Sequence, residues 1–226
     1  MSPPLRLDLH VHSEHSPDSH LSVAEIANAI AEAGLQGFAL TDHQSVAGHA
    51  ELTRVHNLHP RLLLIRGVEA SAREGHLLLY GVSEAPPRDR PVAELLEWTD
   101  ARGAVAVLAH PFRWVHGAGM EVARGARLAG IEGLNGGTTA RANARASQVG
   151  VDRGLSITGG SDAHRREHVG RAYTEFPEGL GSEAELLEAL RRGLGGASGR
   201  SLTWTGRLEL ALRNGAQRAR RGFRPV

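Results

Sequence analysis

Histidine and acidic residues recur in short motifs along most of the chain. In chain order the motifs are Asp8-x-His10-x-His12, Thr41-Asp42-His43, Glu69, His76, His110-Pro111 and Ser161-Asp162-x-His164. Imidazole and carboxylate groups are the ligands of borderline divalent metals such as zinc, manganese and iron. Each motif alone is more often a loop, a turn or a helix cap. Six motifs together predict a cluster of metal ions, so the fold must bring distant parts of the chain to one place.

Length and composition favour a single globular domain. The chain has 226 residues, 41% of them hydrophobic, and a net charge of +1. Cysteine is absent, which excludes disulfides, thiolate zinc sites and cysteine nucleophiles. No apolar run is long enough to span a membrane, and the first residues lack the apolar core of a signal peptide. We therefore expect a cytoplasmic location and no membrane partner.

The first motif lies on a predicted strand. Residues 5–11 alternate apolar and polar side chains, so Asp8, His10 and His12 share one face. This spacing aims both imidazoles at the same site. Asp8 on the same face has two equally weighted roles: orienting an imidazole, or making a hydrogen bond at the strand end.

Strands and helices are predicted to alternate along the chain. Ser22 and Ser182 are expected helix caps, each followed three residues later by a glutamate. The predicted helices are 23–33, 92–102, 140–149 and 182–193; the further strands are 37–41, 62–68, 76–82, 103–108, 130–134 and 155–159. This order predicts a parallel sheet covered by helices, with the candidate ligands at the carboxyl ends of the strands, where barrel enzymes place their chemistry. Residues 84–91, with three prolines, read as a surface loop.

With these motifs in order, the chain resembles the PHP family (polymerase and histidinol phosphatase) over about residues 5–176. The resemblance implies a distorted (β/α)7 TIM-like barrel with two or three zinc, manganese or iron ions at its mouth. It also implies three ligand sets. The first is His10, His12, Glu69 and Asp162; the second is Glu69 as a bridge, His76 and His110; the third is Asp18, His43 and His164. His15 competes with Asp18 for the third set.

These ligands would support hydrolysis. Water shared by two cations is strongly acidified, since one zinc alone lowers its pKa from about 15.7 to about 7. We therefore expect a metal-bridging hydroxide to attack a phosphoester of a small metabolite or nucleotide, with Glu69, Asp162 and His164 in catalytic roles. Alternatives are an oligonucleotide-trimming 5′ exonuclease, a hydrolase of a non-phosphate ester or carbamate, and a non-catalytic metal-binding module.

Substrate contacts are predicted from position along the chain. Arg113, Asn135 and Arg165 follow ligand motifs or end a strand, and a guanidinium can grip phosphate in a fork. Surface arginine is the competing interpretation for Arg113 and Arg165. His116 is expected to be solvated in a loop.

The C-terminal segment is set apart by its charge. We expect residues 1–199 to form the hydrolase domain and residues 200–226, with seven Arg and one Glu, to pack on it or extend from it. A solvated helix is the favoured interpretation, and binding of a nucleic-acid backbone is the alternative. The sequence indicates neither the oligomeric state nor the identity of the substrate.

Overall fold

A computed structural model describes residues 4–202 of the chain. The strands are β1 Leu5–Val11, β2 Gly37–Leu40, β3 Leu63–Ser71, β4 His76–Tyr80, β5 Val105–Leu108, β6 Gly130–Asn135, β7 Ser156–Gly160, β8 Ala172–Phe176 and β9 Gly196–Gly199. The helices are α1 Val23–Glu32, α2 His49–Leu58, α3 Val92–Asp100, α4 Gly119–Gly125, α5 Ala140–Arg153 and α6 Glu183–Arg191, with a short 3₁₀ turn, η1, at Arg166–His168.

The nine strands form one sheet in the order β7-β6-β5-β4-β3-β2-β1-β8-β9. The sheet curls so that its two ends nearly meet, because the Ile157 amide of β7 donates to the Gly195 carbonyl just before β9 at 3.1 Å. The Gly159 amide also donates to Thr174 Oγ1 of β8 at 2.8 Å. The result is the expected α/β architecture, a distorted and almost closed TIM-like barrel.

The sheet is mixed rather than wholly parallel, which corrects the sequence prediction. The pairs β1–β2, β2–β3, β5–β6 and β6–β7 are parallel, whereas β4 is antiparallel to both of its neighbours and β8 to both of its own. The connection between β3 and β4 is too short for a crossover helix, so these strands form a hairpin. His76 therefore begins a strand instead of following one, yet it still lies at the common end.

The two predicted serine caps are confirmed. The Ser22 hydroxyl accepts from the Glu25 amide, and Glu25 accepts from the Ser22 amide at 2.8 Å, a complete capping box for α1. Ser182 caps α6 in the same way, accepting from the Glu185 amide at 3.3 Å. Such caps satisfy helix N–H groups that have no partner within the helix, and each contributes about 1 kcal/mol.

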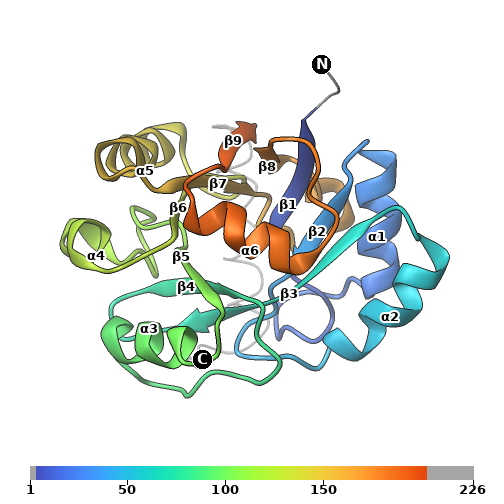
Figure 1. Ribbon diagram of the computed structural model, residues 1–226, viewed down its shortest axis with the longest axis horizontal. Helices are drawn as coiled ribbons and strands as arrows, with labels where there is room; N and C mark the ends of the chain where they lie inside the picture. Colours follow the sequence, from blue (N-terminus) through green and yellow to red (C-terminus); the bar gives the residue numbers. More distant parts are fainter. Residues whose placement is uncertain (1–3, 203–226) are drawn as a thin grey trace, which may run out of the picture.

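Three apolar clusters pack against the sheet. Figure 1 shows the helices that cover it, with α1 and α2 on the right, α4 and α5 on the left and α6 in the middle of the view. One lies under α1 and α2, a second under α3, α4 and α5, and the third holds apolar side chains of α6 against β1, β3, β4 and β5. Helix α6 covers one end of the barrel: its Glu183 pairs with Arg66 near the start of β3, and Arg191 donates to the Gly103 carbonyl before β5. The other end, where the parallel strands terminate, is the mouth.

Several elements went unpredicted. Helices α2 and α4 and strands β8 and β9 were absent from the sequence interpretation, whereas residues 84–91 form a loop as expected. No helix within residues 4–202 has both the length and the apolar character needed to cross a membrane. Nearly all of the predicted Arg-rich segment, residues 203–226, lies outside the described residues.

Candidate metal centre

The mouth gathers the predicted donors from six parts of the chain. His10 lies on β1, Glu69 on β3, and His76 opens β4; the others follow β1, β2, β5 and β7, namely His12, Asp18, His43, His110, Asp162 and His164. These side chains are 2–154 residues apart in the sequence, and the parallel strands bring most of them together because their carboxyl ends share one edge.

Glu69 stands at the middle of this cluster with its two oxygens facing different histidines. Its Oε1 lies 2.7 Å from His76 Nδ1 and 2.9 Å from His110 Nε2. Its Oε2 lies 3.2 Å from the Nε2 atoms of both His10 and His12, and 3.0 Å from His43 Nδ1. The geometry brings together the two ligand sets that a bridging carboxylate would serve.

Asp162 completes the deeper set. Its Oδ1 lies 3.5 Å from His10 Nε2 and 3.3 Å from His12 Nε2. Donor atoms of these three residues and Glu69 all lie within 4.8 Å of one another. All four side chains are at most 5% exposed, so an ion held there would be shielded from solvent.

The third predicted set is more open. Asp18 Oδ2 lies 3.1 Å from His164 Nε2 and 3.5 Å from His43 Nε2, and the Asp18 side chain is 51% exposed. His15, the competing candidate, instead pairs with Glu51 of α2 at 2.7 Å. The structure therefore brings Asp18, and not His15, to the other two members.

Unpartnered atoms test whether a cation fits this cluster. In the described residues, His10 Nε2, His12 Nε2, Glu69 Oε2 and His110 Nδ1 are buried and have no hydrogen-bond partner. A buried polar atom left without a partner costs about 1–3 kcal/mol. Three of these atoms lie close together, because the Nε2 atoms of His10 and His12 are both 3.2 Å from Glu69 Oε2. Their lone pairs suit a borderline divalent metal, so the residues fit such an ion.

Electrostatics in the cluster keep the acids ionised. Burial opposes ionisation of Glu69, but the imidazoles of His10, His110 and His12 around it hold its pKa well below the usual value. Burial acts on Asp162 in the same direction, and the charges of Arg113 and His10 again lower its pKa well below the ordinary range. Both carboxylates are therefore in the form that binds metal.

Two family models match long stretches of the chain. Residues 8–102 match the PHP domain model, and residues 140–194 match the PHP-associated model, so together the two models match about two thirds of the chain. The chain belongs to the PHP family. It is also 25% identical over 118 residues to the uncharacterized protein MJ1587 of Methanocaldococcus jannaschii, a match that covers 48% of this chain and 68% of that protein.

Solved structures share the fold of this PHP chain. A candidate metal-dependent phosphoesterase from Bifidobacterium adolescentis has a TM-score of 0.62 at 18% identity, with 85% of this chain and 98% of that one covered. PsfC from Pseudomonas syringae has a TM-score of 0.69 at 17% identity, with 96% and 99% covered. An amidohydrolase from Chromobacterium violaceum, solved with bound sulfate and no metal, has a TM-score of 0.62 at 21% identity, with 81% and 96% covered. PHP membership and the clustered donors support a metal-dependent hydrolase.

Arg113 reaches into this PHP site from the loop after β5. Its Nη2 donates to Asp162 Oδ2 and, at 2.8 Å, to Asn135 Oδ1, while its Nε donates to Thr138 Oγ1 at 3.2 Å. Asp162 thus turns one oxygen toward the histidines and the other toward the guanidinium. The arginine is anchored beside the centre instead of lying free on the surface.

The other predicted substrate residues differ from Arg113. Asn135 is fully buried, and its side chain is engaged within the protein: Nδ2 lies 3.0 Å from Glu132 Oε2 and 3.2 Å from Asp162 Oδ2. Arg165 is exposed, and its neighbour Arg166 pairs with Glu32 of α1 at 2.6 Å. Of the three, Arg113 has the position that best suits a substrate contact.

Asp8 does not orient an imidazole. Its Oδ1 accepts from the backbone amides of His10 at 3.2 Å and Ser161 at 2.9 Å, and its Oδ2 accepts from the Gly170 amide at 2.9 Å. It ties the end of β7 and the turn before β8 to β1. Of its two predicted roles, the structure shows the strand-end hydrogen bonds.

Two acids that support the ligands were missed. Asp42 accepts from Ser13 and Ser16, and Ser16 Oγ lies 3.2 Å from His12 Nδ1, so Asp42 holds the loop after β1. Glu132 of β6 lies 2.9 Å from His10 Nδ1 and has 1% exposure. A charged residue inside an otherwise apolar predicted strand was the signal available for Glu132.

The backbone at the mouth is unusual. His110, Asp162 and His116 have φ values of 26°, 53° and 64°. These values lie in the left-handed region, which residues other than glycine rarely adopt. His116 is not simply solvated, because its ring stacks on His76 with centroids 4.7 Å apart. Strained residues of this kind tend to gather at functional sites.

Proposed function

We propose that this chain is a phosphoesterase that needs two or three divalent ions, and that it acts on a small phosphorylated metabolite or nucleotide. The observation that carries the proposal is Glu69, whose two oxygens face separate histidine sets at 2.7–3.2 Å. A single carboxylate between two sets of neutral nitrogen donors is the arrangement that would bridge a pair of cations.

For the residues that would hold the ions, we propose the three ligand sets that the family resemblance implies. His10, His12, Glu69 and Asp162 would hold one, Glu69, His76 and His110 a second, and Asp18, His43 and His164 a third, more exposed one. When bound, zinc, manganese or iron ions would supply an acidified water as nucleophile and positive charge for the phosphate oxygens.

The protein's own side chains would then bind and orient the substrate. Arg113 has a planar fork that suits two phosphate oxygens, and its contacts with Asn135 and Thr138 fix the direction of that fork. The side chains of His164 and Asp18 are 27% and 51% exposed, so they are more accessible to solvent than the buried donors.

A substrate panel tests the proposal. The purified protein is loaded with zinc, manganese or iron(II), and its hydrolysis of phosphomonoesters, short oligonucleotides and neutral carboxylic esters or carbamates is measured. We expect phosphomonoester hydrolysis that EDTA abolishes and added metal restores. Glu69→Gln serves as the inactive control. Turnover confined to oligonucleotide ends would favour the exonuclease, and turnover confined to neutral esters or carbamates the rival hydrolase. Metal binding without any turnover would indicate a non-catalytic module.

A further inference from the structure

Glu132 is a buried acid that the proposed ligand sets do not use. It lies on β6, is 1% exposed, and accepts every hydrogen bond that the structure gives it from neutral or histidine donors. The register between β6 and β7 shifts between Glu132 and Leu134, so the strand pairing is irregular directly after the acid.

The first contact of Glu132 determines which ring nitrogen of the candidate ligand His10 carries the proton. Its Oε1 lies 2.9 Å from His10 Nδ1, and His10 is fully buried. A carboxylate oxygen can only accept, so Nδ1 must carry the proton. In the neutral ring, Nε2 then keeps its lone pair, and this atom lies 3.2 Å from Glu69 and 3.5 Å from Asp162.

The second oxygen reaches two more ligand positions. Oε2 accepts from the backbone amide of His110 at 2.8 Å and from Asn135 Nδ2 at 3.0 Å. The same Asn135 nitrogen lies 3.2 Å from Asp162 Oδ2. Glu132 therefore touches His10 and His110 directly and Asp162 through one amide.

The packing makes room for this contact. A Cβ at Gly160 would overlap the Cβ of His10 and come within 3.0 Å of Glu132 Oε1. Only glycine at this position lets β7 lie so close to the His10–Glu132 pair. The pair is thus built by three strands: β1, β6 and β7.

We propose that Glu132 is the positioning residue of the metal centre, which fixes the tautomer of His10 and the placement of His110 and Asp162. The inference rests on the proposed function, since it needs a cation at Glu69. An oxygen of Glu132 also lies within 4.8 Å of donor atoms of His10 and His110, but we assign it an orienting role because its Oε2 already accepts from a backbone amide and from Asn135.

The test is Glu132→Gln. If the amide oxygen keeps the His110 and Asn135 donors, the amide nitrogen faces His10 Nδ1 and can only donate to it. His10 must then carry its proton on Nε2, which removes the lone pair that would bind metal. We expect zinc affinity, measured by competition with a chromophoric chelator, to fall about 10- to 100-fold. The matched control is Glu183→Gln on α6, which breaks the pair with Arg66 far from the mouth and should leave affinity unchanged.

A measurement on the wild-type protein avoids dependence on the variant's folding. In protein loaded with cadmium-113, long-range proton–nitrogen spectra should show metal coupling at His10 Nε2 and a proton on Nδ1. Coupling at Nδ1 instead, or an affinity of Glu132→Gln within twofold of wild type, would overturn the role of Glu132 while leaving the metal centre standing. Wild-type protein that binds no divalent cation would overturn the proposed centre, and this inference with it.

Discussion

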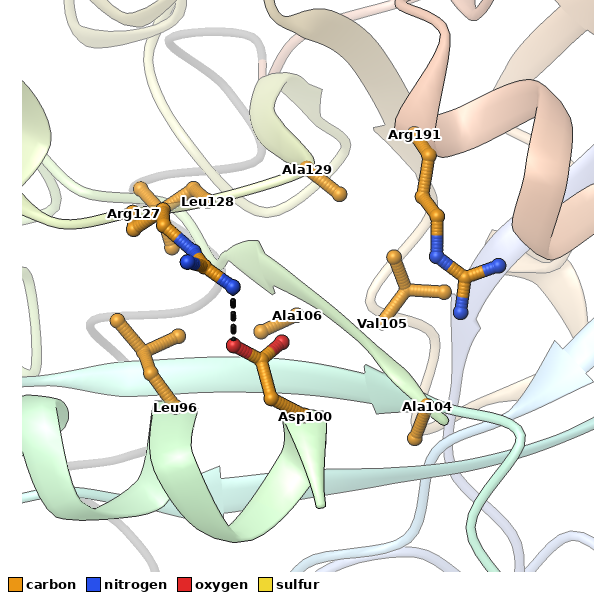
Figure 2. A pocket seen from close by; sticks show the side chains of 9 residues that line it. All are labelled: Leu96, Asp100, Ala104, Val105, Ala106, Arg127, Leu128, Ala129 and Arg191. Carbon is orange, nitrogen blue, oxygen red and sulfur yellow. Dashed lines mark hydrogen bonds and ion pairs between the residues drawn. The ribbon is translucent and has the colours of Figure 1, made fainter. Parts of the chain in front are cut away.

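The two ends of the barrel differ in how deeply their charged residues are buried. At the mouth, acids and histidines are buried, and four of the six buried side-chain atoms that lack a hydrogen-bond partner in residues 4–202 belong to candidate ligands. At the α6 end, a pocket of about 190 Å³ lies between α3, β5 and the segment before β6. Figure 2 shows its apolar floor and its charged rim, where Arg127 pairs with Asp100 at 2.6 Å.

The charged side chains around the pocket at the α6 end have partners within the protein. The Arg127 and Asp100 side chains are 86% and 57% exposed, and Arg191 donates to the Gly103 carbonyl. Exposed pairs of this kind contribute little, about 0–1 kcal/mol. A cavity with charged residues is therefore a weaker sign of function than buried polar atoms that converge without partners.

The largest effect should come from the bridging position. Glu69→Gln replaces the carboxylate that faces His10, His12, His76 and His110 with a neutral amide. Metal assistance contributes several kcal/mol of transition-state stabilisation, and each 1.36 kcal/mol is tenfold, so turnover should fall by on the order of 10³-fold or more. Steady-state rates on a phosphomonoester measure this, with circular dichroism to verify the fold. Near-normal rates at full metal content would refute a two-metal mechanism.

Metal binding should stabilise the protein through residues at the mouth and not through residues at the α6 end. Cations that bind the native state at 100 times their dissociation constant stabilise it by about 2.7 kcal/mol. We expect zinc to raise the melting temperature of EDTA-treated wild type, and to do so much less for the double variant His10→Ala, His12→Ala. Asp100→Asn at the α6 end should keep the full shift. An equal shift in the double variant would show that the ligand assignment is wrong.

Arg113 should distinguish phosphate from neutral substrates. Its loss removes a charge-assisted contact worth about 2 kcal/mol, so kcat/KM for a phosphomonoester should fall roughly 30-fold in Arg113→Ala. Lys should rescue only in part, because it lacks the planar fork. Hydrolysis of a neutral ester should barely change. Metal content must be matched, because Arg113 also contacts Asp162. Unchanged phosphomonoester kinetics would remove Arg113 from the substrate site.

The smallest effects should come from the rim of the α6-end pocket. Arg127→Ala or Asp100→Asn breaks one exposed pair, so the free energy of unfolding should change by less than about 1 kcal/mol. Neither metal affinity nor kcat/KM should move. Chemical denaturation and the same rate assay measure this. A tenfold loss of activity in either variant would contradict the contrast between the two ends.

Local signals in the sequence predicted much of the scaffold. The serine–glutamate pairs at Ser22 and Ser182 identified two helix starts, and the alternation in residues 5–11 identified β1. The direction of β4 was missed because periodicity carries no information about strand direction. Helix α2 was missed because its apolar stripe is weak: only Leu52 and Val55 are buried.

The residues that orient the candidate ligands could not be predicted, because their contacts join distant parts of the sequence. The Glu132–His10 pair spans 122 residues, and no local pattern connects its members. The choice between Asp18 and His15 depended on Glu51, which lies 36 residues from His15 and draws its ring away. Ligand types can be read from motifs, whereas the groups that orient them depend on how strands meet.

The left-handed backbone at the mouth has a consequence for engineering. Strain of this kind costs about 1–3 kcal/mol per residue, and glycine would relieve it at His110, His116 and Asp162. Selection for heat resistance alone should therefore drift toward glycine at these positions and lose the imidazoles and the carboxylate with it. A library meant to yield a sturdier hydrolase should hold all three fixed and draw its gains from the helical shell.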